Sequence, residues 1–228
     1  MKLHCLVHHR AENEKRKVNE TKLLRKKSPR HAQIAIAFVF AIIVALVAFL
    51  MVARSTPAQF KGLDLGKTPA PDFRLTDQNG QTVALSDLRG KIVVLTFVYT
   101  QCVDVCPVIA AKLSQVYDQV GDDVPQVVFV AVSVSPEDDT PESIRAFSQK
   151  FHMEGRWIYL NGSRAELQLV WQAYYLYIAT PVPPNTQVGH QTRVVLIDRA
   201  SRERVHFSQD FDPADLVHDL RLLIESDE

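Results

Sequence analysis

Cysteine is scarce in this 228-residue chain, which has only three: Cys5 near the N-terminus and the close pair Cys102 and Cys106. Scaffolds stapled by several disulfides need more cysteines, so that class of protein is excluded. The sequence also has no internal repeat, which excludes solenoids and propellers. Its 26 Lys and Arg are balanced by 26 Asp and Glu, so the basic excess typical of nucleic-acid-binding proteins is missing too.

One long stretch lacks charge altogether, because the twenty consecutive residues 34–53 are all apolar. At 1.5 Å per helical residue, such a stretch can cross a hydrocarbon core of about 30 Å. The alternative, a cleaved signal peptide, usually has a shorter apolar part. Ten basic residues but only three acidic ones precede the stretch, and basic flanks stay on the cytoplasmic side. We therefore predict a cytoplasmic tail (1–33), a single-pass anchor in the cell membrane (34–53), a linker (54–70) and an extracytoplasmic domain (71–228).

The apolar pattern of residues 71–228 predicts alternating strands and helices. Residues 91–99 and 126–134 are apolar nearly throughout, which is typical of strands buried on both faces. Helices are predicted after Pro107, Thr140 and Ser163 from N-terminal proline and capping patterns. The remaining predicted elements are a hairpin around 78–80, a short strand at 157–160, a strand pair at 193–198 and 204–208, and a last helix after Asp212. This order predicts an α/β fold, a thioredoxin-like mixed sheet with helices on both faces.

The cysteine pair lies between the first buried strand and the helix predicted at Pro107. Cys106 is expected at the helix N-cap and Cys102 one turn earlier, at the carboxyl edge of the sheet where open α/β sheets place their sites. The positive end of a helix favours thiolate over thiol, and a thiolate is both a nucleophile and a ligand for soft metal ions. The spacing therefore permits a redox disulfide or a Cu(I) or Zn(II) site.

A further ligand is available at His190, which ends a proline-rich loop and precedes the strand predicted at 193–198. In a thioredoxin-like topology this loop faces the start of the cysteine-bearing helix. Two thiolates and one imidazole suit trigonal Cu(I), and additional ligands would suit Cu(II).

Three segments resemble the Sco/SenC family. They are residues 96–107, which contain Cys-Val-Asp-Val-Cys-Pro at 102–107, residues 139–142 with Asp-Thr-Pro-Glu, and His190 before 194–198. The resemblance covers roughly residues 71–224. Proteins of this family are membrane-anchored, thioredoxin-like copper chaperones that help assemble the binuclear copper centre in subunit II of cytochrome c oxidase. The resemblance implies that Cys102, Cys106 and His190 ligate copper and that subunit II is the partner.

An enzymatic function is the alternative, namely an extracytoplasmic thiol-disulfide oxidoreductase in which Cys102 attacks a disulfide and Cys106 resolves the intermediate. Such a pair would need a thiol-disulfide reductant as a second partner. A peroxiredoxin is disfavoured because Leu95 and Tyr99 stand where its motif requires Pro and Thr or Ser. A plain binding module would leave the cysteine pair unexplained. Copper transfer and thiol exchange are compatible with each other.

Overall fold

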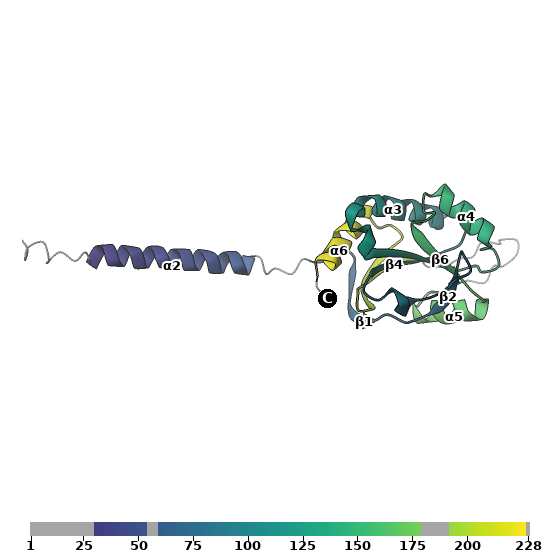
Figure 1. Ribbon diagram of the computed structural model, residues 1–228, viewed down its shortest axis with the longest axis horizontal. Helices are drawn as coiled ribbons and strands as arrows, with labels where there is room; N and C mark the ends of the chain where they lie inside the picture. The colour runs from purple at the N-terminus through teal and green to yellow at the C-terminus, as the bar shows by residue number, and fades with distance from the viewer. Residues whose placement is uncertain (1–29, 54–58, 179–191, 227–228) are drawn as a thin grey trace, which may run out of the picture. The chain divides into compact units, whose positions relative to one another are not determined.

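The chain forms two compact units, residues 1–57 and 58–228 (Figure 1). The computed structural model describes residues 30–53, 59–178 and 192–226. In the first unit, helix α2, Arg30–Ala53, covers the predicted anchor, and its described side chains at 33–48 are exposed. Across the described residues, no helix combines the length and apolarity needed to cross a membrane. The single-pass anchor therefore stays a prediction.

The second unit is built on one eight-stranded mixed sheet with the order β1-β8-β7-β4-β5-β6-β2-β3. Strands β4, β5 and β6 run parallel to one another, and the other neighbours pair antiparallel. The strands are β1 Leu63–Pro69, β2 Arg74–Asp77, β3 Thr82–Ala84, β4 Ile92–Val98, β5 Val127–Ser133, β6 Trp157–Asn161, β7 Arg193–Ile197 and β8 Arg202–Ser208.

Helices cover both faces of this sheet, as predicted. In Figure 1, α3 and α4 lie on one side of the strands and α5 on the other, with α6 packed beside α3. The helices are α3 Val105–Val120, α4 Pro141–Lys150, α5 Arg164–Ala173 and α6 Pro213–Glu225, and two 3₁₀ turns lie at Leu85–Leu88 and Gly121–Gln126.

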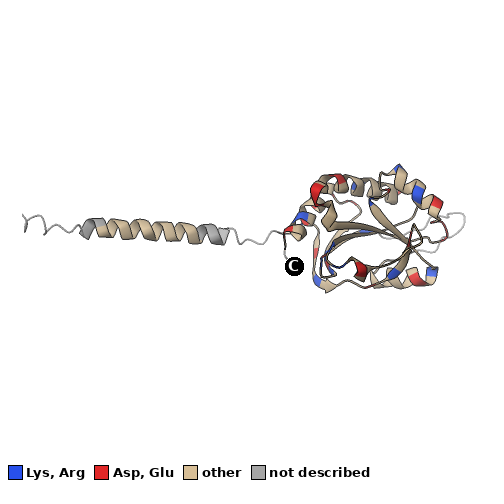
Figure 2. Ribbon diagram, viewed as in Figure 1, with Lys and Arg blue, Asp and Glu red and all other residues tan. Residues whose placement is uncertain are grey.

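The core follows from the apolar runs in the sequence. All seven residues of β4 are buried, and so are six of the seven in β5. Neither strand contains a charged residue, and Figure 2 shows the charged residues mainly on the helices and outer strands. The prediction of two strands buried on both faces is confirmed.

Three of the helices begin where their capping residues predict. The Thr140 hydroxyl accepts the Ser143 N–H at the start of α4, and the Asp212 carboxylate accepts the Ala214 N–H at the start of α6. At α5, Ser163 and Glu166 form the predicted capping box. These side chains satisfy backbone donors that a helix start leaves without partners.

Strand β1 is a difference from the prediction, because it lies inside the residues 54–70 expected to form a linker. It pairs with β8 at the edge of the sheet, and its side chains are mostly exposed. An edge strand tolerates Gly66 and Pro69, which would be unfavourable in a central strand. Its composition therefore resembles that of a linker.

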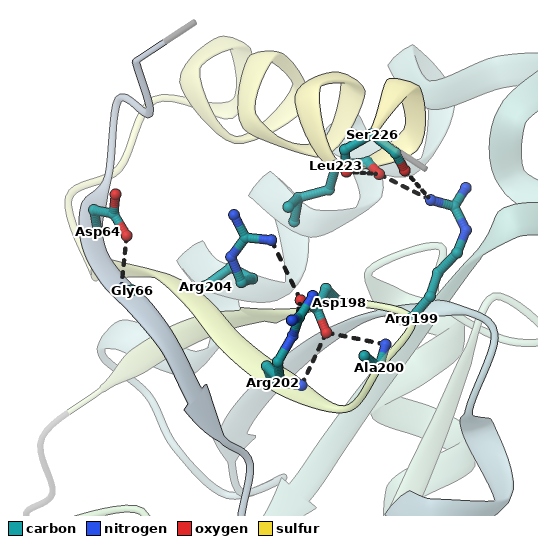
Figure 3. Close-up of polar contacts among 9 residues, drawn as sticks. All are labelled: Asp64, Gly66, Asp198, Arg199, Ala200, Arg202, Arg204, Leu223 and Ser226. Carbon is teal, nitrogen blue, oxygen red and sulfur yellow. Dashed lines mark hydrogen bonds and ion pairs between the residues drawn. The ribbon is translucent and has the colours of Figure 1, made fainter. Parts of the chain in front are cut away.

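The β7–β8 hairpin is held by the buried carboxylate of Asp198 (Figure 3). This carboxylate accepts the backbone N–H groups of Ala200 and Arg202 and contacts the guanidinium groups of Arg202 and Arg204 at 2.8 and 3.3 Å. Arg199 next to it donates to backbone carbonyls at the C-terminal end of α6. These contacts hold the hairpin together and join it to α6, and its strand β7 pairs antiparallel with β4, which ends at the cysteine segment.

Candidate metal centre

The two cysteines lie at the junction between β4 and α3. Strand β4 ends at Val98, a short loop contains Cys102, and α3 begins at Val105. Cys106 therefore lies in the first turn of the helix, and Asp104 rather than Cys106 is the N-cap residue, which corrects the sequence-based prediction by two positions. Proline is compatible with any position of a first turn because its missing N–H has no helical partner there.

The structure brings the two thiols together at the carboxyl edge of the sheet, as predicted. Neither thiol is in a disulfide; Cys106 is fully buried, and Cys102 is 8% exposed. The backbone N–H of Cys106 points at the Cys102 sulfur, with 3.5 Å between N and Sγ. A negative sulfur at this place faces the open N–H groups of a helix start.

The two thiols have opposite tendencies to ionise. The pKa of Cys102 is lowered to about 6, first because the Cys106 side chain hydrogen-bonds its sulfur, and also because backbone N–H groups of residues 104–106 face it; burial acts against this effect. The pKa of Cys106 is raised, first by the same hydrogen bond and then by burial and the nearby Cys102 charge. At neutral pH the pair is thus one thiolate, Cys102, and one thiol, Cys106.

Asp139 lies behind the pair and joins the surrounding segments. Its buried carboxylate accepts hydrogen bonds from the Thr100 N–H at 2.8 Å, the Ser133 hydroxyl at 2.5 Å and the Tyr159 hydroxyl at 2.8 Å. Burial raises the pKa of Asp139 despite these donors, and the charge of Asp139 in turn helps to raise the pKa of Cys106. Sequence reasoning missed this role, because Asp139 next to Thr140 looks like part of a helix cap.

His190 lies outside the described residues, so its distance from the cysteines is not defined. The chain resumes at Thr192, and β7 pairs antiparallel with β4 through Thr96 and Val194. The Thr96 hydroxyl donates to the Arg193 carbonyl at 3.1 Å. The described chain therefore re-enters the sheet at the same edge from which β4 leads to Cys102. Within the described residues, no three His, Cys, Asp or Glu side chains are grouped to hold a metal ion, and ligation by His190 stays a prediction.

The donor set fits a soft metal ion. Two sulfurs one helical turn apart, one of them already ionised, are the type of ligand that Cu(I) and Zn(II) prefer over harder ions. The same thiolate and thiol can lose one proton and two electrons and close a disulfide. The described residues therefore support metal capture and thiol exchange at one place.

The chain is similar in sequence and in fold to known proteins. The sequence pattern of the SCO1/SenC family matches residues 63–225. A SCO2-like protein of Rickettsia conorii is 26% identical over 154 residues, which are 66% of this chain and 74% of the relative. The structure of Bradyrhizobium japonicum ScoI with copper bound is 30% identical with a TM-score of 0.61, over 68% of this chain and 99% of that one.

Arabidopsis thaliana ScoI with copper bound is similar to the same region. It is 25% identical with a TM-score of 0.63, over 70% of this chain and 100% of that one. The mixed sheet with helices on both faces therefore matches the thioredoxin-like fold of Sco proteins, and the family match covers more than half of the sequence. The chain belongs to the SCO1/SenC family.

Proposed function

We propose that this protein binds copper as a chaperone in the assembly of cytochrome c oxidase and delivers it to the binuclear copper centre of subunit II. The observation that carries the proposal is the pair of facing thiols, Cys102 as thiolate and Cys106 as thiol, at the start of α3. The similar Bradyrhizobium and Arabidopsis proteins hold copper. The resemblance to the family is the basis for proposing subunit II of the oxidase as the protein that accepts the copper.

The proposed ligands are Cys102, Cys106 and His190. Cys102 is ready to ligate near neutral pH because its pKa is about 6. Cys106 must first lose the proton that its raised pKa retains, so binding releases a proton and is weaker in acid. His190 would supply an imidazole nitrogen and complete a three-coordinate site for Cu(I), while further ligands would allow Cu(II).

Copper stoichiometry tests this function. The reduced unit 58–228 is expected to bind one copper ion per chain, and both Cys106→Ser and His190→Ala are expected to lose affinity by at least about tenfold, since each removes one of three donors. His218→Ala is the matched control, because His218 is a half-exposed histidine on α6 that contacts Asp219. Equal binding by wild type and by Cys106→Ser would contradict the proposal.

A second function, thiol-disulfide exchange with a partner dithiol, is favoured by the asymmetry of the pair. A thiolate with a neighbouring thiol is the arrangement in which Cys102 attacks a disulfide and Cys106 resolves the intermediate. A reductant of the thiol-disulfide class would then return the pair to the dithiol. Disulfide exchange that persists in His190→Ala while copper binding is lost would identify this as the main activity.

A further inference from the structure

A cavity of about 210 Å³ opens beside Cys102, between the start of α3 and the length of α4. The two helices lie on the same side of the sheet in Figure 1. Cys102 forms one wall, and Pro107 of α3 lies beside it. The opposite wall consists of Ala146 and Phe147 of α4 and of Phe151, which follows the helix. The cavity therefore lies between Cys102 and an apolar surface.

The walls of this cavity are tied together. The Thr100 hydroxyl, two residues before Cys102, donates to the Ser143 hydroxyl of α4 at 3.1 Å. The Thr100 N–H donates to the carboxylate of Asp139, just before α4 begins. Because the cysteine loop and α4 are joined by these bonds, the cavity keeps its shape without a ligand, which lowers the entropic cost of filling it.

Apart from the Cys102 sulfur, the lining carries one charged group, which is positive. Lys150 is the one charged side chain among the residues that line the cavity, and its ammonium group lies 5.4 Å from the centre of the Phe151 ring. Phe147 is 6% exposed and forms the buried floor. Such a lining fits a segment that offers an apolar side chain to the aromatic rings and a carboxylate to Lys150.

We propose that this cavity is the docking site for the cysteine-bearing segment of the partner, and that it selects a segment with an apolar and an acidic residue next to the partner cysteine. The proposal rests on the proposed function, since both copper transfer and thiol exchange require a partner sulfur to reach Cys102. The cavity is the space next to that sulfur. Its contacts place the partner cysteine at Cys102 before any bond changes.

Disulfide exchange with two synthetic peptides measures this selection. Each peptide carries one cysteine as a mixed disulfide with thionitrobenzoate; one has Leu and Glu beside the cysteine, and the other has Ser and Lys. The Cys102 thiolate attacks the peptide sulfur, a Cys102–peptide disulfide forms, and the thionitrobenzoate thiolate leaves with the electron pair of the broken bond. Its absorbance gives the rate, and the peptide disulfide is the only oxidant.

Wild-type protein is expected to react about tenfold faster with the Leu and Glu peptide than with the Ser and Lys peptide, which corresponds to burial of one apolar side chain. Ala146→Trp fills the cavity and should abolish the preference. Gln149→Trp is the control, since Gln149 is exposed on the same helix but outside the lining. It should keep the preference. Lys150→Glu should reduce it by about twofold to fivefold, as expected for an exposed charge pair.

A neutral small disulfide, 2,2′-dithiodipyridine, shows whether the reactivity of the Cys102 thiol itself has changed. It should react at the same rate with wild type, Ala146→Trp and Gln149→Trp. Equal rates for the two peptides in wild type, or a preference that survives Ala146→Trp, would overturn the proposal. So would a dimer in sedimentation that Ala146→Trp dissociates, because a second copy would then be the occupant. Copper stoichiometry on the same proteins is a separate measurement. Failure to bind copper would refute the copper function, whereas the peptide preference alone tests whether the cavity is the docking site.

Discussion

At the scale of single residues, the two cysteines of one short motif differ in their protonation. Both sulfurs are buried, but the Cys102 sulfur accepts hydrogen bonds from the Cys106 side chain and from backbone N–H groups at the helix start, including that of Cys106. A thiolate is the form that ligates metals and attacks disulfides. The pair therefore has one sulfur ready to react and one that reacts second.

The pH dependence of alkylation tests this difference on residues 58–228, which contain no other cysteine. Because the pKa of Cys102 is about 6, its reaction with iodoacetamide should be half-maximal near pH 6 and fall as the pH drops below that value. Cys106→Ala removes the first cause of the low pKa, so the midpoint should rise. Cys106→Ser keeps a hydroxyl donor, so its midpoint should rise less.

Mass spectrometry would assign the modified residue in this experiment, and Cys102 is the one expected. A wild-type midpoint close to 9, the ordinary value for this thiol, would contradict the account. The same conclusion would follow from identical midpoints in wild type and Cys106→Ala.

At the scale of elements, Asp139 connects three neighbouring strands to the start of α4. Its carboxylate binds Thr100 after β4, Ser133 at the end of β5 and Tyr159 in β6. Three donors converge on one buried acceptor, so its loss removes the acceptor of the Thr100 N–H and of the Ser133 hydroxyl and leaves the Tyr159 hydroxyl with the Val98 carbonyl at 3.3 Å. Buried donors that lose their acceptor are costly.

Urea unfolding at pH 7 should show this cost. Asp139→Ala is expected to lower the free energy of unfolding by about 3 kcal/mol, whereas Ser133→Ala, which removes one donor, should cost about 1 kcal/mol. Asp139→Asn keeps one acceptor oxygen, so its loss of unfolding free energy should lie between those of the other two variants. If the Asp139→Ala variant were as stable as the Ser133→Ala variant, the three hydrogen bonds would not form the proposed connection.

Much of the fold could be predicted from local sequence signals. The apolar runs of β4 and β5, the capping box at Ser163 and the Thr140 cap each act within a few residues. Strand β1 was missed because its pairing with β8 is a long-range contact and its composition is polar. The start of α3 was misplaced because Pro107 is acceptable at several first-turn positions.

The candidate site could be predicted only in part, for a similar reason. The cysteine pair is visible as a motif, since its spacing is local. The Asp139 contacts and the cavity beside Cys102 depend on how α4 and β6 pack against the cysteine loop, and no nearby residue encodes that packing. His190 itself lies outside the described residues.

At the scale of the whole molecule, the charge of the chain is divided along its length. Ten basic and three acidic residues precede residue 34, so the remainder carries about seven more acidic than basic residues. The second unit holds Cys102 and Cys106 and has its own core. We propose that residues 34–53 anchor this unit on the outer side of the cell membrane, which the basic tail supports.

Alkaline carbonate extraction of membranes tests the anchor. The full chain should remain in the membrane pellet, because twenty apolar residues cannot be released by breaking ionic contacts. A chain beginning at residue 58 should be extracted. Release of the full chain by carbonate would contradict the proposed anchor, and it would leave the metal centre unaffected.

In the proposed metal centre, Cys102, Cys106 and His190 together hold copper. X-ray absorption at the copper edge, on the reduced unit 58–228 loaded with Cu(I), measures the donors directly. Wild type should show two sulfur donors and one nitrogen donor, with the nitrogen lost in His190→Ala and one sulfur lost in Cys106→Ser. Copper without any sulfur donor, or with the same donors in all three proteins, would contradict this ligand set.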